Sequence, residues 1–204
     1  MKKNLVILSY GGHARSVADI ALSCGYEKLI FVDQSAYSGE NFFGHEVISS
    51  VDEIPDIAGD AISAAGDNSK RALECAFIKS VGLNLISLIS PSAHVGIGCS
   101  IGAGCLVGSH AHLGPQSIVG DGCIINTGAI VEHESRVGEY SHIAVNAAIA
   151  GKSSVGNFCM LGIGSSVGDG VSITDCVIVG AGGVVHCPIT QAGTYVGVPV
   201  RKIK

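Results

Sequence analysis

A six-residue period of aliphatic residues runs through the second half of the chain. From residue 94 to residue 189 the sequence divides into sixteen blocks of six, and the second residue of every block is Val, Ile or Leu. Chance would produce such a series on the order of once in a billion sequences, so the period reflects the fold. The aliphatic positions are Val95, Ile101, Val107, Leu113, Val119, Ile125, Val131, Val137, Ile143, Ile149, Val155, Leu161, Val167, Ile173, Val179 and Val185.

This period predicts a triangular coil of short parallel strands, because six residues match neither an α-helix nor an up-and-down sheet. Three blocks then make one turn of 18 residues, and successive turns stack at the strand spacing of about 4.8 Å. The sixteen blocks make a little over five turns. The aliphatic residue of each block points into a narrow core, and a second, mostly small residue lies near each corner. Four cysteines share that small position, so they are interpreted as core residues and not as nucleophiles or ligands: Cys99, Cys105, Cys123 and Cys159.

The first 90 residues have a different pattern, in which apolar strands alternate with helices. The segment NLVILSYGGHARSVADIALSCG predicts a strand, a glycine turn and a helix, and KLIFVDQS predicts a second strand ending at Asp33. A loop through Gly44 follows, after which DAISAAGDNSKRALECAFIKS repeats the strand–turn–helix order. This order predicts a small parallel sheet of Rossmann type. We therefore expect two domains, 1–88 and 89–204.

The glycine turn is a candidate nucleotide site. Gly11 and Gly12 would let a phosphate approach the backbone at the helix N-terminus, and Asp33 is placed to accept a ribose or base hydrogen bond. The dinucleotide fingerprint is incomplete because Arg15 stands where the third glycine belongs. About 90 residues also make only half of a dinucleotide fold, which disfavours NAD. From the residues alone, a nucleotide site and a purely structural α/β cap both stay open.

Composition excludes several classes of protein. The net charge of −5 argues against a nucleic-acid surface, which needs a basic face. No apolar run is long enough to span a membrane, and the N-terminus lacks the apolar region of a signal peptide, so we expect a cytoplasmic protein. The eight cysteines include no C-x-x-C pair. We therefore expect reduced thiols and no metal site.

The candidate chemistry lies in the segment IVEHESRVGEYSHIAV, where Glu132 and Glu134 flank His133. A histidine beside a carboxylate is a typical general base. Gly151 follows His133 by 18 residues, so it occupies the same place one turn further along the coil. A glycine there leaves room above the imidazole and presents an N–H that could stabilise an oxyanion. On spacing alone, His133 could equally be an exposed corner residue.

The whole chain resembles one group of hexapeptide-repeat acyltransferases. The segments that carry the resemblance are YGGHARSV, FVD and GDNSKR in the first domain, and NTGAIVEHESRVGEYSHIAVNAAIAGKSSVGNFCMLGIGSSV and YVGVPVRK in the second. They are similar to the nucleotide-sugar and sialic acid acetyltransferases, and most similar to enzymes that N-acetylate a nucleotide-linked 4-amino-4,6-dideoxyhexose. The resemblance implies a left-handed parallel β-helix, a homotrimer, and acetyl-CoA bound in the groove between neighbouring coils.

The resemblance also implies roles for individual residues. His133 is the general base, Glu134 orients its ring, and Asn126 lies near the sugar. His142 lies near the thioester carbonyl, and Gly151 together with Ile163 and Ala181 belongs to the acetyl-CoA site. The nucleotide-sugar pocket comprises Gly11, Gly12, His13, Asp33, Gly66, Asn68 and Arg71. Arg71 would either meet a phosphate or cover its helix. Relatives that bind uridine often have two acidic residues where this chain has Asp33-Gln34, so UDP and dTDP both stay open.

Other interpretations remain at this stage. O-acetylation of a sialic acid would use the same base on a hydroxyl group, and a repeat coil can also be a non-enzymatic scaffold. A zinc lyase needs two histidines five residues apart on the coil, which this chain lacks. Arg201 and Lys202 would either meet CoA phosphates or form a frayed tail. Four further histidines are expected at the surface: His94, His110, His112 and His186.

Overall fold

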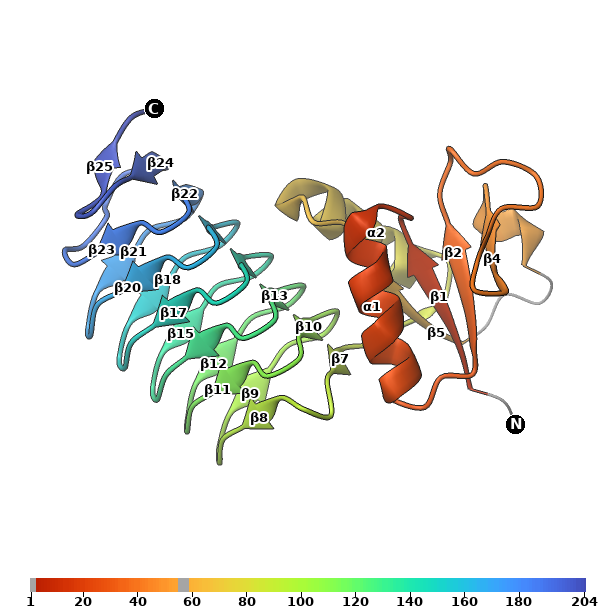
Figure 1. The fold of residues 1–204 in the computed structure, drawn as a ribbon, viewed down its shortest axis with the longest axis horizontal. Helices are drawn as coiled ribbons and strands as arrows, with labels where there is room; N and C mark the ends of the chain where they lie inside the picture. The colour runs from red at the N-terminus through yellow and green to blue at the C-terminus, as the bar shows by residue number, and fades with distance from the viewer. Residues whose placement is uncertain (1–2, 55–58) are drawn as a thin grey trace. The chain divides into compact units, whose positions relative to one another are not determined.

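The computed structural model describes residues 3–54 and 59–204 (Figure 1). The chain divides into two compact units, Met1–Leu88 and Ile89–Lys204. Each unit has its own core, and each is described by itself below.

The N-terminal unit is a parallel sheet with a helix on each face. Its strands lie in the order β3-β4-β2-β1-β5-β6. In Figure 1 helix α1 lies in front of this sheet and α2 behind it, which follows from right-handed crossovers that leave β1 and β5 in opposite directions. The elements are β1 (Asn4–Leu8), α1 (Gly12–Ser23), β2 (Lys28–Val32), β3 (Asn41–Phe42), β4 (His45–Ile48), the 3₁₀ turn η1 (Val51–Glu53), β5 (Asp60–Ser63), α2 (Asn68–Ser80) and β6 (Asn84–Leu85). The predicted Rossmann-like order is confirmed.

The segment predicted as a loop through Gly44 is instead a hairpin. Strands β3 and β4 pair antiparallel, with Phe42 opposite His45. Phe43 and Gly44 form its two-residue turn, and both have positive φ, 50° and 83°. Two consecutive residues with positive φ are typical of the tight turn that joins two short strands. The strands are too short to produce a visible alternation in the sequence, so the prediction was wrong here.

The C-terminal unit is a left-handed parallel β-helix built almost entirely from two-residue strands, so the predicted fold class is confirmed. The strands form three ladders, in which each strand pairs with the strand 18 residues further on. The first ladder contains β7 (Leu88–Ile89), β10 (Leu106–Val107), β13 (Ile124–Ile125), β16 (His142–Ile143), β19 (Met160–Leu161), β22 (Val177–Val179), β24 (Gly193–Val196) and β25 (Arg201–Lys202). The second contains β8 (His94–Val95), β11 (His112–Leu113), β14 (Ile130–Val131), β17 (Ala148–Ile149), β20 (Ser166–Val167) and β23 (Val184–Val185). The third contains β9 (Ser100–Ile101), β12 (Ile118–Val119), β15 (Arg136–Val137), β18 (Ser154–Val155) and β21 (Ser172–Ile173).

Three corners connect these ladders, and we name each by one residue. The Asn126 corner follows the first ladder and includes residues 126–129, 144–147, 162–165 and 180–183. The His133 corner follows the second ladder and includes residues 132–135, 150–153 and 168–171. The Tyr140 corner follows the third ladder and includes residues 120–123, 138–141 and 156–159. Residues 18 apart therefore stack in columns along each corner.

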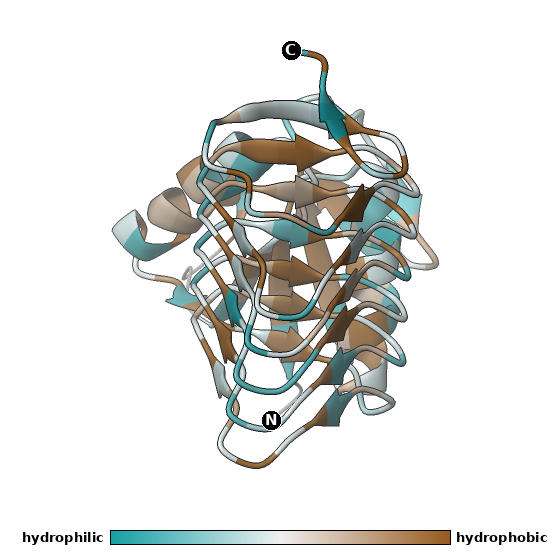
Figure 2. Ribbon diagram, turned by 90° about the vertical axis from the view of Figure 1, so that its left-hand side faces the viewer, coloured by the Kyte–Doolittle hydropathy of each residue, from teal (hydrophilic) through white to brown (hydrophobic). Residues whose placement is uncertain are grey.

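The aliphatic residues of the period form the core of the coil. From Val107 to Val185 every one of them is buried, and Figure 2 shows hydrophobic strands repeating from turn to turn. Val95 and Ile101, in the first turn, are only partly covered because no earlier turn lies beneath them. The predicted core is confirmed.

The small inner residues add a second layer of order. Hydroxyl and thiol groups at this position donate to the carbonyl oxygen 15 residues further on, as in Ser135 to Ala150 (2.8 Å) and Ser141 to Gly156 (2.7 Å). Cys105, Cys123 and Cys159 donate in the same way to Gly120, Gly138 and Thr174, at 3.1, 3.0 and 3.1 Å. Burial raises the pKa of the Cys159 thiol to about 11. These cysteines are core residues, as predicted, and they also satisfy corner carbonyls.

Candidate active site

His133 lies at the corner between β14 and β15, beside the carboxylate of Glu134. The Nδ1 atom of His133 is 3.1 Å from Oε2 of Glu134, and each side chain is 48% exposed. An ionised carboxylate only accepts hydrogen bonds, so Nδ1 carries the proton and the lone pair of Nε2 faces outward. Glu134 has a φ of 59°, the left-handed conformation that recurs at these corners in Gln116 and Lys152. The corner conformation thus turns the carboxylate towards the ring of its neighbour.

Gly151 lies against the imidazole of His133, one turn further along the coil. The Lys152 amide donates to the His133 carbonyl oxygen at 2.9 Å, which sets this register. A Cβ built on Gly151 would lie 2.5 Å from both Cε1 and Nε2 of His133. Only glycine leaves room for the ring in this position. The Gly151 N–H has no hydrogen bond within residues 3–54 and 59–204, which is compatible with the predicted oxyanion role.

Asp169 continues the same column, and the sequence analysis missed it. It lies 18 residues beyond Gly151 and is exposed. The Cβ built on Gly151 would lie 3.1 Å from Oδ1 of Asp169. The 18-residue period, applied twice from His133, was the signal that identifies this residue. A second carboxylate therefore lies near the outward-facing nitrogen of His133.

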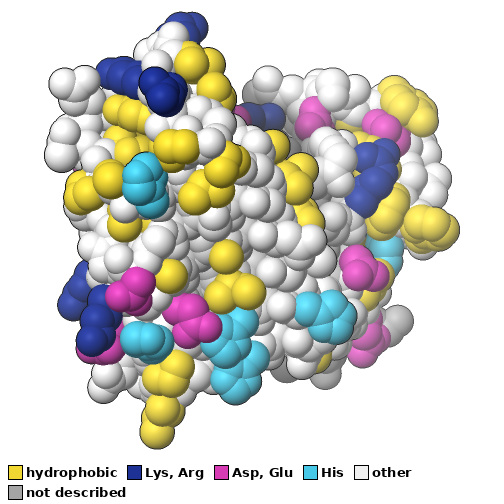
Figure 3. Space-filling view, turned by 60° about the vertical axis from the view of Figure 1, so that its left-hand side comes forward, with side chains coloured by type: hydrophobic (Ala, Val, Ile, Leu, Met, Phe, Trp, Pro, Cys, Tyr) yellow, Lys and Arg dark blue, Asp and Glu magenta, His cyan; other side chains and the backbone are white. Residues whose placement is uncertain are grey.

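Glu132, on the other side of His133, faces a stack of histidines. Its Oε2 accepts from the His133 amide at 3.2 Å, and its Oε1 is 4.0 Å from Nε2 of His112. The rings of His112 and His94 stack with their centroids 5.0 Å apart. Figure 3 shows histidine and acidic side chains adjoining one another on the face that it presents. His94 and His112 are surface residues, as predicted, although they are paired with each other and not isolated.

Asn126 and His142 form a second pair, on the first ladder and the corner after it. His142 is 8% exposed, and its Nε2 lies 3.1 Å from Nδ2 of Asn126. Oδ1 of Asn126 accepts from the Thr127 amide at 2.8 Å, so Nδ2 is left to donate to the imidazole. The sequence predicted that Asn126 lies near the sugar and His142 near the thioester. The structure brings the two side chains together, and their roles stay predictions.

Ile163 and Ala181 stack along the Asn126 corner. The Gly182 amide donates to the Ile163 carbonyl oxygen at 2.8 Å, and both residues are exposed. Each chain thus presents the predicted acetyl-CoA residues Ile163 and Ala181 on one corner and His133 with Gly151 on the next.

In the N-terminal unit, Asp33 lies where β2 ends. Its Oδ2 accepts from the Tyr10 amide at 2.8 Å, and its Oδ1 accepts from the Ser35 amide and hydroxyl at 3.0 and 2.6 Å. The Ser35 hydrogen bonds hold the pKa of this carboxyl below its usual range, so Asp33 is ionised. Gly11 caps α1 with its backbone alone, since no side chain caps this N-terminus. Asp33 therefore ties together the ends of two parallel strands, at the edge where such folds bind ligands.

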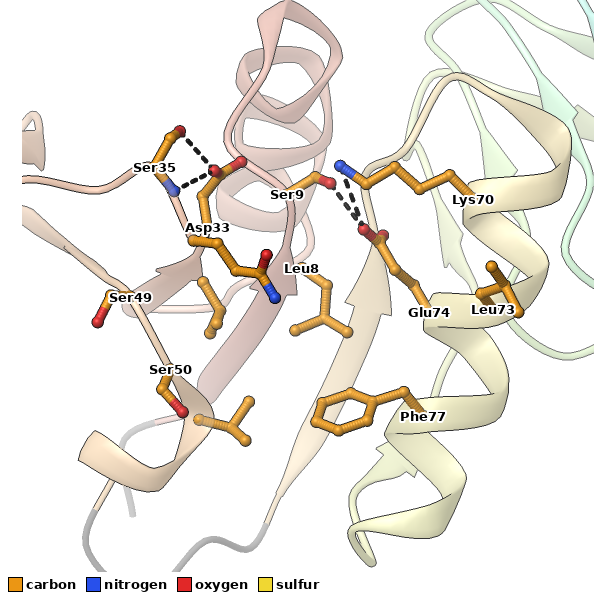
Figure 4. Close-up of a pocket in the computed structure, with 13 residues that line it drawn as sticks. Leu8, Ser9, Asp33, Ser35, Ser49, Ser50, Lys70, Leu73, Glu74 and Phe77 are labelled. Atoms are coloured by element: carbon orange, nitrogen blue, oxygen red, sulfur yellow. Dashed lines mark hydrogen bonds and ion pairs between the residues drawn. The ribbon is translucent and has the colours of Figure 1, made fainter.

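A pocket of about 500 Å³ opens beside Asp33 (Figure 4). On its far side Glu74 of α2 accepts from the Ser9 hydroxyl at 2.7 Å and lies 3.7 Å from Nζ of Lys70. Leu8 and Phe77 contribute apolar surface between the two carboxylates. The sequence analysis found Asp33 but missed the other polar residues, because Glu74 reaches this edge only through the packing of α2. The lining comprises Leu8, Ser9, Val32, Asp33, Gln34, Ser35, Ser49, Ser50, Val51, Lys70, Leu73, Glu74 and Phe77.

The other predicted nucleotide-site residues do not line this pocket. Arg71 is 1% exposed, and its guanidinium donates to the Ala65 and Gly66 carbonyl oxygens at 3.0 and 3.2 Å and to Oδ1 of Asn68 at 2.7 Å. It holds the turn between β5 and α2 from within. Burial, together with the nearby Arg71 charge, lowers the pKa of His13, so this imidazole is neutral. The two turns that contain Gly11, Gly12 and Gly66 have open space where a Cβ would lie.

Two features that would suggest other functions are missing from the described residues. Within residues 3–54 and 59–204, no three His, Cys, Asp or Glu side chains form a group that could hold a metal ion. In the same ranges, neither helix has the length and apolarity needed to cross a membrane.

Comparison with known proteins reveals similarity over the whole chain. Residues 4–73 match the family described as the PglD N-terminal domain. The structure of PerB from Caulobacter crescentus, solved with CoA and GDP-perosamine, is 31% identical and superposes with a TM-score of 0.90, covering 100% of this chain and 99% of that one. The acetyltransferase domain of PglB from Neisseria gonorrhoeae, also solved with acetyl coenzyme A, is 28% identical with a TM-score of 0.92, and both chains are covered completely. WeeI from Acinetobacter baumannii, at 18% identity and a TM-score of 0.70, shares the fold. No curated protein sequence matches the chain.

Proposed function

Because the chain belongs to the hexapeptide-repeat N-acetyltransferases of nucleotide-linked amino sugars, we propose that it acetylates the 4-amino group of a nucleotide-linked 4-amino-4,6-dideoxyhexose, with acetyl-CoA as donor. The observation that carries this proposal is the His133–Glu134 pair beside Gly151, in a coil that matches the relatives over its full length. A non-enzymatic scaffold would have no need of a fixed, outward-facing imidazole. The pair therefore favours catalysis.

His133 is the general base in this mechanism. Its Nδ1–H donates to Glu134, so Nε2 is free to accept a proton from the sugar amine. The amine nitrogen attacks the thioester carbonyl carbon, and Nε2 takes the proton that the nitrogen loses as the C–N bond forms. The Gly151 N–H is the proposed donor to the oxyanion. When the C–S bond breaks, the imidazolium returns its proton to the departing CoA sulfur, and Glu134 stabilises the imidazolium in between.

The N-terminal unit is the proposed nucleotide site. The turns at Gly11 and Gly66 offer exposed backbone for phosphates, and the pocket beside Asp33 has the size and mixed polarity of a nucleoside site. Our expectation of UDP or dTDP must be widened to include GDP, because PerB was solved with GDP-perosamine. Arg71 contributes to this site by holding the second turn, since its guanidinium is already bonded inside the protein.

We further propose a homotrimer that works in the cytoplasm. The predicted acetyl-CoA residues and His133 lie on different corners of one coil, so a neighbouring coil can supply the missing side of each site. Acetyl-CoA and nucleotide sugars are both cytoplasmic metabolites, which supports the same compartment.

The direct test is thiol release from acetyl-CoA with a panel of amino sugars. The panel contains UDP-, dTDP- and GDP-linked 4-amino-4,6-dideoxyhexoses, with free sialic acid for comparison. We expect turnover with one nucleotide amino sugar and a product heavier by one acetyl group in mass spectrometry. Release with sialic acid alone would move the enzyme to O-acetylation and contradict the proposal. Silence across the panel from folded protein would contradict it as well.

A further inference from the structure

Asp169 lies in a column with the proposed base and has no task in the mechanism above. The three residues of this column, His133, Gly151 and Asp169, follow one another at intervals of 18. The Cβ position of Gly151 is 2.5 Å from Nε2 of His133 and 3.1 Å from Oδ1 of Asp169. The two atoms therefore lie on the same side of the corner, no farther apart than two hydrogen bonds placed end to end.

The gap between these two atoms is open. His133 and Asp169 form no hydrogen bond or ion pair with each other, and Asp169 forms none with any other residue in the ranges 3–54 and 59–204. Gly151 keeps the gap clear, because any side chain at that position would occupy it. One nitrogen atom that donates to both acceptors at ordinary hydrogen-bond distances would fit between them.

We propose that Asp169 binds the amine of the acceptor sugar and thereby selects an amine over a hydroxyl group. This inference rests on the proposed N-acetyltransfer. A neutral primary amine has two N–H donors and one lone pair. With one N–H on Nε2 of His133 and the other on Oδ1 of Asp169, the lone pair is directed away from both acceptors, towards the thioester.

The same geometry is unsuitable for a hydroxyl group. A hydroxyl has a single hydrogen, so it can donate to His133 or to Asp169 but not to both. A hydroxyl bound to His133 would place an oxygen lone pair against the Asp169 carboxylate. As the C–N bond forms, by contrast, the amine nitrogen becomes positive and its bond to the carboxylate strengthens. His133 then takes one proton, and the N–H bonded to Asp169 remains on the amide product.

The test compares Asp169→Asn and Asp169→Glu with the matched control Asp175→Asn. Asp175 is the same residue type on the next corner of the same turn, and its Oδ1 accepts from the Asn157 amide at 2.7 Å, a bond that an asparagine oxygen can keep. Each protein is assayed with the nucleotide amino sugar and with its 4-hydroxy analogue on the same nucleotide, and kcat/KM is measured across pH.

We expect Asp169→Asn to lower kcat/KM for the amine roughly 10- to 100-fold, the usual effect of losing a hydrogen bond to a charged group. The KM for acetyl-CoA and the thermal midpoint should not change. The preference for amine over hydroxyl should narrow, and Asp169→Glu should recover part of it. The control should behave as wild type.

Three results would overturn this role. Equal kcat/KM for the amine in Asp169→Asn and wild type would do so while leaving the proposed function intact. A shifted pH profile with an unchanged amine-to-hydroxyl preference would show that Asp169 acts only through His133. Wild-type transfer to the hydroxyl sugar alone would overturn both the role of Asp169 and the proposed N-acetylation.

Discussion

At the scale of single residues, the orientation of His133 depends on two neighbours that hold it from different sides. Glu134 holds Nδ1 at 3.1 Å, and Gly151 provides the space that the ring occupies. The first contact depends on a residue with positive φ at a coil corner, and the second depends on the absence of a side chain. A base oriented in this way keeps Nε2 directed outward without a deep pocket around it.

Gly151→Ala tests the second contact. The new methyl group would lie 2.5 Å from the imidazole, so the ring must rotate away, and it can do so because it is half exposed. We expect a folded protein with a nearly unchanged thermal midpoint and acetyl transfer reduced by about 100-fold or more, as for loss of a general base. Steady-state kinetics and a thermal melt measure the two effects. Wild-type activity in this variant would mean that the observed ring position is not the catalytic one.

The sequence predicted part of this site and could not reveal the rest. His133 and Gly151 follow from the 18-residue period, and the same period leads to Asp169 when it is applied once more. Glu74 is different, because it lies in a helix and meets Ser9 across 65 positions of sequence. No local pattern encodes that contact, since it depends on how α2 packs against the sheet.

At the scale of elements, the coil depends on inner hydroxyl and thiol groups as much as on its aliphatic core. Strands of two residues form few ladder hydrogen bonds, so the corner carbonyls need other donors. Ser135, Ser141 and Cys159 each supply one, to the carbonyl oxygen 15 residues ahead. This explains why the small position holds Ser or Cys so often, a preference that small size alone does not account for.

Cys159 offers the sharpest test of this role. Cys159→Ala leaves the buried Thr174 carbonyl oxygen without its donor, and an unsatisfied group of this kind costs roughly 1–3 kcal/mol. Cys159→Ser keeps a donor of similar size in place. We expect the alanine variant to melt at a lower temperature and the serine variant to stay close to wild type, as measured by differential scanning calorimetry. Equal loss in both variants would show that only packing matters at this position.

The elements themselves were predictable to different degrees. Sixteen repeats of one pattern made the coil evident, because each block reinforces the same period. The β3–β4 hairpin was missed because Asn41–Phe42 is too short to alternate, and only the Phe43–Gly44 turn signals it. Short single elements thus depend on turn geometry, which the sequence expresses in one or two residues.

At the scale of the whole molecule, each chain distributes its predicted catalytic parts over two corners. His133 and Gly151 lie on one corner, and Ile163 and Ala181 lie on the next. In the proposed trimer, each site combines the His133 corner of one chain with the Asn126 corner of its neighbour. The site would then exist only in the assembly, which is why one chain of sequence specifies its parts without closing it.

Mixed trimers test this arrangement. His133→Ala removes the base, and Ala181→Trp fills the predicted acetyl-CoA groove, so each variant alone should be inactive. Coexpressed in equal amounts and assembled at random, they should recover about a quarter of wild-type activity, because one site in four then combines two intact corners. Light scattering should give the mass of a trimer. An inactive mixture of proven mixed trimers would place the whole site within one chain.

The central claim is that the imidazole of His133 removes the proton from the attacking amine, and His133→Asn tests it most directly. Single-turnover acetyl transfer to the nucleotide amino sugar is measured beside acetyl-CoA binding and the thermal melt, with His110→Asn as control because His110 is an exposed histidine on another corner. We predict a loss of about 100- to 10,000-fold in transfer for His133→Asn, with binding and melting unchanged and the control fully active. Transfer at the wild-type rate by a folded His133→Asn protein would contradict the account.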